Sequence, residues 1–228
     1  MPSPLKEGRT SGAARDGVSE FTTERLSIYL RCLAQLETAG VTTISSAKLA
    51  ERFHLNSAQI RKDLACLGEL GIRGVGYRVS DLRSHLAQAL GIDRTRKVII
   101  FGAGNLGVAL ADHRGFNVDG FEVVGLFDDD DLKHGRSTRY GIPIQPVDRL
   151  KAVIASEQVE IGIIAVPAPA AQEVCDLLVD AGIAAILNFA PVQLRQREGV
   201  AITSVDLRIN LESLSFALTS ARKSWPPI

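Results

Sequence analysis

The sequence has few cysteines, no long apolar run and no net charge, and each absence narrows the class of protein. Its three cysteines, Cys32, Cys66 and Cys175, lie far apart and form no Cys-x-x-Cys pair. They therefore predict neither a disulfide framework nor a metal site. No apolar stretch is long enough to cross a membrane, and no charged and then apolar leader opens the chain. We expect a soluble, cytoplasmic protein with reduced thiols.

The charges cancel over the whole chain but are unevenly distributed. Residues 1–92 carry 12 Lys and Arg against 9 Asp and Glu, whereas the remainder carries 14 against 17. A mildly basic N-terminal part fits contact with a polyanion. With 46% hydrophobic and 23% charged residues among 228, the chain can bury the core of one large domain or two modest ones.

The N-terminal part opens on a segment with little to bury. Residues 1–18 are rich in Gly, Ser, Pro and Arg, and we expect a disordered tail. An apolar stripe with helical spacing follows, which predicts a helix capped by Thr22 or Thr23 that stops near Gly40.

Two further helices are marked by serine caps. Ser45 or Ser46 is expected to cap a short helix that ends at Phe53. Ser80 is expected to cap a later helix that ends at Gly91.

The start of the helix between these two carries three signals. Asn56 is expected to be the N-cap, and Gln59 three residues later completes a capping box. Leu55 and Ile60 flank the cap as a hydrophobic staple. A short turn before such a helix is typical of a helix-turn-helix, whose recognition helix points polar side chains at base edges. The outer face of this helix carries Ser57, Gln59, Arg61 and Lys62.

A glycine-rich segment follows and is typical of a hairpin wing. Its glycines at 68, 71, 74 and 76 are interleaved with Arg73, Tyr77 and Arg78. Arginine on a glycine-rich tip is attracted to the potential of a minor groove. A solvated basic face is the alternative for Arg61 and Lys62, but the short helix, the capped helix and the wing together favour binding of double-stranded DNA.

A second domain begins with a glycine motif. The apolar run 97–101 ends on G-x-G-x-x-G at Gly102, Gly104 and Gly107, and a helical pattern follows at once. The first glycine permits the turn, the second lets the backbone approach a pyrophosphate, and the third allows close packing of helix and strand. The phosphates would lie at the helix N-terminus.

The next apolar strand supports a dinucleotide site. It ends in Asp128, near the spacing at which an acidic side chain reaches a ribose 2′-hydroxyl. The carboxylates at 129–131 would repel a 2′-phosphate and favour NAD(H) over NADP(H), although Lys133 and Arg136 nearby weaken that preference. A solvated loop is the simpler interpretation for most of these acids.

Further strands are expected at 161–166, 184–188 and 200–205, with helical patterns at 147–155 and 170–181 between them. This alternation predicts an α/β fold with a doubly wound parallel sheet of Rossmann type. Ligands of such sheets lie beyond the strand ends, where Pro167, Asn188, Phe189 and Pro191 occur. Phe189 could stack on a nicotinamide ring or pack in the core.

The last segment, 207–223, predicts a helix with Leu207, Leu211, Leu214 and Leu218 on one stripe. Its apolar face must cover its own domain or a partner's. We place a winged helix-turn-helix domain at 19–92, a polar connector at 93–96, a dinucleotide-binding domain at 95–206 and a C-terminal dimerisation helix at 207–228.

Several segments in one order resemble the Rex family of redox-sensing transcriptional repressors. They lie between about residues 21 and 218, and they are 56–64, 68–77, 102–107, 166–167 with 171–172, and 182–191. The resemblance implies a homodimer that exchanges its C-terminal helices, binds palindromic operator DNA and is released when NADH binds, whereas NAD⁺ permits or favours the DNA-bound form. No membrane contact and no catalytic or metal-binding residue is expected.

The resemblance also implies two sets of site residues. The expected DNA-binding residues are Arg25, Ser46, Ser57, Gln59, Arg61, Lys62, Arg73, Gly74, Val75, Gly76 and Tyr77. The expected residues around NADH or NAD⁺ are Gly102, Ala103, Gly104, Asn105, Leu106, Gly107, Asp128, Val166, Pro167, Asn188 and Phe189.

One departure from the family concerns a tyrosine that some members carry in an Ala-Asp-Tyr segment. This chain has Ala111-Asp112-His113 there, and the aspartate that the tyrosine would partner is expected to be Asp206. A His113–Asp206 pair would respond to pH near neutrality.

Two other functions stay open at this point. An NAD-dependent dehydrogenase would need an acid or base near the nicotinamide, and none of the four histidines follows the strands expected there. A CoA-binding protein on the same fold is also compatible with the glycine turn.

Overall fold

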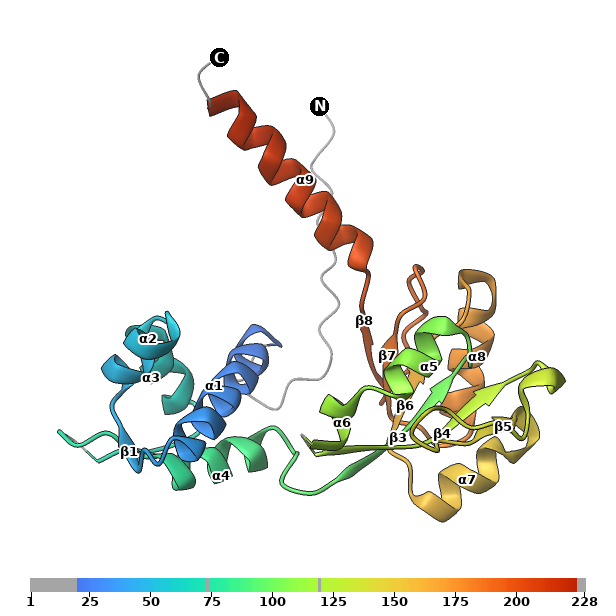
Figure 1. The fold of residues 1–228 in the computed structure, drawn as a ribbon, viewed down its shortest axis with the longest axis horizontal. Helices are drawn as coiled ribbons and strands as arrows, with labels where there is room; N and C mark the ends of the chain where they lie inside the picture. Colours follow the sequence, from blue (N-terminus) through green and yellow to red (C-terminus); the bar gives the residue numbers. More distant parts are fainter. Residues whose placement is uncertain (1–19, 73, 119, 225–228) are drawn as a thin grey trace. The chain divides into compact units, whose positions relative to one another are not determined.

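The computed structural model describes residues 20–72, 74–118 and 120–224. The chain divides between Thr95 and Arg96 into two compact units, each with core clusters of its own. Figure 1 shows the elements of both units. The tail predicted for residues 1–18 lies outside the described residues.

The first unit is a helical domain with a small two-stranded sheet. Its core contains a fully buried side chain from each helix: Leu33, Leu49, Ile60 and Leu86. The one-sided apolar stripes of the sequence meet in this core, which fixes the short helices against the longer ones. The elements are α1 (Glu20–Thr38), β1 (Thr43–Ile44), α2 (Ser46–Phe53), α3 (Ser57–Ala65), β2 (Tyr77–Arg78) and α4 (Val79–Ala89).

The N-caps predicted for α2 and α3 are confirmed. Ser45 caps α2, and its Oγ accepts the backbone N–H of Lys48 at 3.2 Å. Asn56 caps α3, and its Oδ1 accepts the N–H groups of Ala58 and Gln59 at 2.9 and 3.0 Å. These bonds fix where α3 starts and therefore which side chains its first turn presents.

The caps predicted for α1 and α4 are wrong. Both Thr22 and Thr23 lie inside α1. The helix α4 begins at Val79, one residue before Ser80, after an N-cap residue that makes no side-chain cap bond. Thr22 and Val79 are buried. Because these residues pack in the core, each helix begins before the residue that was predicted to cap it.

Between α3 and β2 the chain forms the predicted hairpin. Ile72 and Gly76 form an isolated antiparallel bridge, and each backbone N–H donates to the other's carbonyl at 2.8 and 2.9 Å. The strand β2 then pairs antiparallel with β1. The side chains of Ile72 and Val75 are 62% and 57% exposed, and Arg73 lies outside the described residues. We call residues 72–76 the wing.

The second unit contains a six-stranded sheet in which every neighbouring pair is parallel. The order β5-β4-β3-β6-β7-β8 is the doubly wound order that the alternation of elements predicts. It reverses direction beside β3, so the carboxyl ends of β3 and β6 flank the crevice where such sheets bind ligands. The strands are β3 (Arg96–Phe101), β4 (Phe121–Asp128), β5 (Ile144–Pro146), β6 (Ile161–Ile164), β7 (Ala185–Asn188) and β8 (Ala201–Ser204).

Helices cover both faces of this sheet. On β3, Ile99 and Phe101 pack into the core with α7 and α8, and Val98 and Ile100 pack into the core with α5 and α6. The alternation follows from the two-residue period of a strand. The helices are α5 (Asn105–Ala111), α6 (Arg114–Val118), α7 (Leu150–Glu157) and α8 (Ala168–Asp180), with short 3₁₀ turns η1 (Asp131–Lys133) and η2 (Val147–Arg149).

The edge strand β5 was not expected from the sequence. It has three residues, one of them Pro146, and it pairs with β4 alone. A segment this short shows no apolar alternation, and proline is tolerated there because it is an edge.

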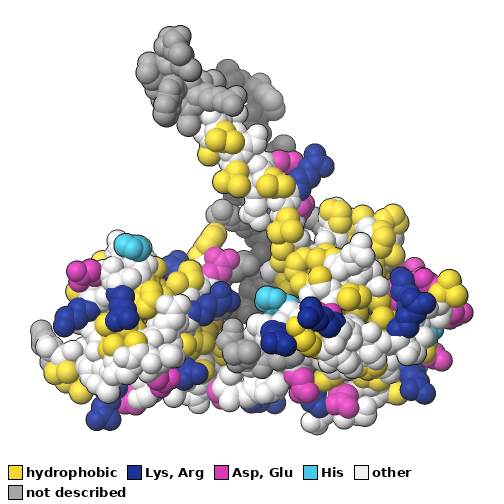
Figure 2. All heavy atoms as spheres, viewed as in Figure 1, with side chains coloured by type: hydrophobic (Ala, Val, Ile, Leu, Met, Phe, Trp, Pro, Cys, Tyr) yellow, Lys and Arg dark blue, Asp and Glu magenta, His cyan; other side chains and the backbone are white. Residues whose placement is uncertain are grey.

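The helix predicted at the C-terminus is confirmed as α9 (Leu207–Ser224). Residues 207–220 are all exposed in the single chain, and Figure 2 shows hydrophobic side chains along the helix. Exchange of α9 within a dimer stays a prediction. Among the described helices, none is long and apolar enough to cross a membrane.

Candidate dinucleotide site and nucleic-acid interface

The glycine-rich loop lies between β3 and α5. Gly102 has a φ of +104°, and a Cβ there would overlap the carbonyl oxygen of Ala165. A Cβ on Gly107 would overlap the carbonyl oxygen of Gly102, so only glycine lets α5 pack this closely on the turn. At Gly104 the described residues leave open space within 4 Å of a Cβ. The first and third glycines therefore shape the loop, and the second leaves room for a ligand.

Asp128 ends β4 beside this loop and is 5% exposed. Its Oδ2 accepts the backbone N–H of Ala103 at 2.7 Å, and its Oδ1 accepts that of Asp130 at 3.0 Å. The Nζ of Lys133 lies 3.0 Å from both oxygens. Burial alone would raise the pKa of Asp128, but the bonds from Lys133 and the two N–H groups lower it. The carboxylate thus fixes the loop, and its contact with a ribose stays a prediction.

The charge of Lys133 bears on the choice between NAD(H) and NADP(H). Its ammonium group lies 3.0 Å from Asp128 and 3.7 Å from Asp130. Two carboxylates therefore pair with Lys133, one of the two cations that weakened the expected preference for NAD(H). That preference stays a prediction, supported by this pairing.

Other predicted dinucleotide contacts surround the loop. Asn105 and Leu106 are exposed in the first turn of α5, whereas Ala103 is buried and uses its N–H on the β4 carboxylate. Val166 is half-buried, and its Cγ1 would touch a Cβ at the first glycine of the motif. Pro167 is exposed and caps α8 without a side-chain bond. The structure therefore brings the ends of β3, β4 and β6 together.

Asn188, the last residue of β7, and Phe189, which follows it, both face inward. Asn188 is fully buried, and its Nδ2 donates to the carbonyls of Ala190 and Val192 at 3.1 and 3.0 Å. Its Oδ1 accepts the N–H of Ala190 at 2.9 Å. These bonds from the Asn188 side chain therefore stabilise the loop that follows β7. Phe189 is half-buried and packs against the core on the α5 and α6 face, so a nicotinamide contact stays a prediction.

In the first unit, several predicted DNA-binding residues share one surface. Arg61 is exposed on α3, and its Nη1 donates to Oγ of Ser46 on α2 at 3.2 Å. Both residues line a hollow of about 670 Å³ between α3 and the wing. Lys62 is exposed and Ser57 is half-buried on the same helix. The hollow is also lined by Gly74, Val75, Gly76 and Tyr77.

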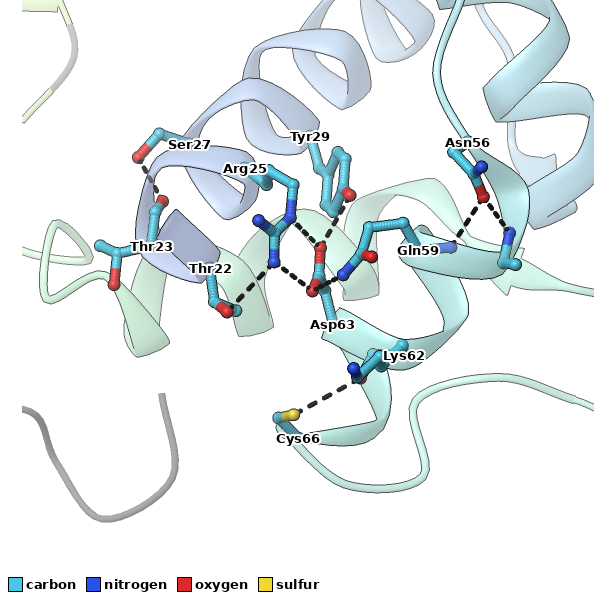
Figure 3. A network of polar contacts seen from close by, with 11 residues as sticks. Thr22, Thr23, Arg25, Ser27, Tyr29, Asn56, Gln59, Lys62, Asp63 and Cys66 are labelled. Carbon is cyan, nitrogen blue, oxygen red and sulfur yellow. Dashed lines mark hydrogen bonds and ion pairs between the residues drawn. The ribbon is translucent and has the colours of Figure 1, made fainter. Parts of the chain in front are cut away.

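Two other predicted DNA-binding residues, Arg25 and Gln59, converge on the carboxylate of Asp63 (Figure 3). Arg25 donates through Nε to Oδ2 and through Nη2 to Oδ1, both at 2.7 Å. The Nε2 of Gln59 donates to Oδ1 at 2.7 Å, and the hydroxyl of Tyr29 donates to Oδ2 at 2.9 Å. The amide of Gln59 is thus directed toward Asp63. Among the described residues it makes no bond back to the backbone N–H of Asn56, so the second half of the predicted capping box is wrong.

The charge state of this cluster is set by its geometry. Asp63 is 2% exposed, and the hydrogen bond from Arg25 holds the pKa of its carboxyl below the usual range. Burial and the bond to Asp63 raise the pKa of Tyr29 to about 12. At neutral pH the cluster is therefore a carboxylate, a guanidinium, a neutral phenol and an amide.

Sequence reasoning did not single out Asp63 as the centre of a buried polar cluster, although a signal existed. Asp63 follows Gln59 by four residues, so both lie on one helix face. It also sits beside Ile60 and Leu64 on the side that faces the core. An acid on the inner face of a helix predicts buried donors from another element.

The predicted pair of His113 and Asp206 is not formed within the described part of this single chain. The ring of His113 lies edge-on to Phe116, with centroids 5.1 Å apart. Asp206 accepts the backbone N–H of Arg208 at 2.9 Å. A pair between two subunits stays a prediction. Within the described residues, no group of three His, Cys, Asp or Glu side chains is placed to hold a metal ion.

Two family models match the chain, one in each unit. Residues 17–65 match the model described as putative DNA-binding protein N-terminus. Residues 93–192 match the model described as CoA binding domain.

Proteins of known name resemble the chain over most of its length. The redox-sensing transcriptional repressor Rex of Carboxydothermus hydrogenoformans is 48% identical over 199 residues, which cover 87% of this chain and 95% of that protein. The chain also resembles two structures of RSP, a Rex-family repressor. With NAD⁺ and operator DNA, RSP gives a TM-score of 0.85 at 36% identity over 91% of this chain and 95% of RSP. With NADH, the TM-score is 0.77 at the same identity, over 91% and 97%.

Proposed function

The chain belongs to the Rex family of redox-sensing transcriptional repressors, and we propose that it is a cytoplasmic homodimer that binds a palindromic operator and leaves it when NADH binds. It thereby reads the ratio of NADH to NAD⁺. One observation carries this proposal: the chain combines a glycine loop that is open at Gly104 with a capped helix beside a wing. It also aligns with Rex repressors over most of its length.

The dinucleotide is NADH or NAD⁺, held around the glycine loop. The relative of similar structure was solved with each of the two. The loop offers the N–H groups at the start of α5 to the pyrophosphate, and the open space at Gly104 allows its approach. The chain is a member of a repressor family and not an enzyme, which rejects the dehydrogenase alternative. The test must also distinguish NADH from CoA as the ligand, because one matching family model is described as a CoA binding domain.

The DNA-reading surface consists of the start of α3, Ser46 and the wing. Arg61 is held toward this surface by its bond to Ser46, and Lys62 is exposed beside it. A two-fold dimer places two such surfaces on the half-sites of a palindrome. The ligand acts by binding one arrangement of the dimer better than the other, so DNA and NADH must weaken each other's binding by the same factor.

The proposal predicts that NADH releases the protein from its operator at far lower concentration than NAD⁺. The measurement is fluorescence anisotropy of the full chain on a labelled duplex carrying a palindrome obtained by selection, at constant salt. NADH, NAD⁺ and CoA are titrated separately, with a random duplex as the control. Absence of specific binding under every condition contradicts the repressor. Release by CoA alone contradicts the choice of nucleotide.

Replacing Arg61 by alanine should weaken palindrome binding by roughly 1–3 kcal/mol, the worth of a bidentate base contact. The random duplex should be affected less, because it offers no matched base. Arg31→Ala, which removes an exposed arginine from α1, is the matched control for loss of charge. Equal losses on both duplexes would make Arg61 a phosphate contact.

A further inference from the structure

The carboxylate of Asp63 is saturated by donors from two helices (Figure 3). Each oxygen accepts two hydrogen bonds: Oδ1 from Arg25 and Gln59, and Oδ2 from Arg25 and Tyr29. Arg25 and Tyr29 belong to α1, whereas Gln59 and Asp63 belong to α3. Because Asp63 is 2% exposed, these bonds exclude water and join α1 to α3 at one point.

This arrangement has a consequence for the amide of Gln59. A glutamine amide offers a donor and an acceptor that exchange places when the group turns over. A carboxylate only accepts, so Asp63 requires the nitrogen of Gln59 on its side, at 2.7 Å. The oxygen Oε1 and the second N–H of Gln59 are then left in one orientation, on a half-buried side chain in the first turn of α3.

We propose that Asp63 is a positioning residue that sets base preference, because it fixes the amide orientation of Gln59 on the DNA-reading helix. A fixed amide presents one pattern of donor and acceptor to a base edge, whereas a turning amide matches several. Asp63 itself is buried and contacts no DNA. The inference rests on the proposed function, because it assumes that α3 reads operator DNA.

The test compares four variants of the full chain by anisotropy on the palindrome, on a random duplex and on palindromes with each base pair changed in turn. Asp63→Asn keeps the size of the side chain but places an amide nitrogen among donors. It should weaken palindrome binding about tenfold, the size of one base contact, and change random-duplex binding less than twofold. It should lose preference at the same base pair as Gln59→Ala. The double variant should lose no more at that pair than either single variant.

Tyr29→Phe is the matched control, because it removes one donor from Asp63 and leaves Gln59 in place. It should lower the thermal midpoint and keep the pattern of base preference. If Asp63→Asn keeps the preference that Gln59→Ala loses, or weakens all positions equally, the inference is overturned. NADH binding by each variant reports whether the second unit is intact.

A measurement on the unaltered protein covers the case in which Asp63→Asn does not fold. The side-chain ¹⁵N relaxation of Gln59, assigned by its loss in Gln59→Ala, should show an amide as ordered as the backbone of α3. A mobile amide overturns the inference. Absence of specific DNA binding by the unaltered protein, with an ordered Gln59 amide, would instead reject the proposed function.

Discussion

Replacing Gly107 by alanine should abolish the response to NADH and destabilise the second unit. A Cβ at this position overlaps the carbonyl oxygen of Gly102, which is backbone and cannot rotate away. The turn cannot retreat either, because Gly102 already lies against the carbonyl of Ala165 with a φ of +104°. The start of α5 must therefore move, at a cost of roughly 1–3 kcal/mol for overpacking. Thermal unfolding and NADH titration measure the two effects.

Gly104→Ala is the matched control, and its expected result is different. The described residues leave open space around a Cβ at Gly104, so the variant should unfold at an unchanged temperature. Its methyl group would occupy the space through which the backbone approaches a pyrophosphate, so NADH binding should still be lost. Both variants should bind the operator and stay bound when NADH is added. Unimpaired NADH binding by Gly104→Ala would contradict the placement of the phosphates.

The features predicted correctly from the sequence are those that local chemistry determines. Asn56 caps α3 because a short side-chain oxygen reaches the free N–H groups of the next turn. The three glycines define a loop because a Cβ at Gly102 or Gly107 has no room. The apolar runs form strands in the doubly wound order because each is bounded by turns and followed by a helix.

The features missed depend on partners far away in the sequence. Asn188 lies at the carboxyl end of a strand, as ligand contacts often do, but three groups of the following loop and of β8 surround its amide nitrogen. Asp128 has the spacing of a ribose contact, yet its oxygens hold the glycine loop and Lys133. The role of Asp63 depends on α1, which lies 38 residues earlier at Arg25. No window of local sequence contains such pairs.

Replacing Leu211 and Leu214 on α9 by lysine should convert the proposed dimer into a monomer. The two side chains are 66% and 62% exposed in the single chain, so lysine should not harm the fold of either unit. A monomer binds each half-site separately and loses the advantage of linkage, so palindrome affinity should fall roughly 10²–10⁴-fold. Sedimentation and anisotropy measure the two losses. Thr219→Lys, on a polar side of α9, is the control and should stay dimeric.

The apolar residues of α9 also say how the helix must be covered. At 100° per residue, Leu207, Leu211, Leu214 and Leu218 share one side, whereas Ile209 and Phe216 fall on the opposite side. A helix with apolar residues on opposite sides needs cover on both, and a simple pairing of two α9 helices would leave Phe216, which is 75% exposed, in water. If α9 is inserted into the partner subunit, the single variants Phe216→Lys and Leu211→Lys should therefore both break the dimer. A dimer that survives Phe216→Lys but not Leu211→Lys would reject insertion and favour pairing along the leucine side alone.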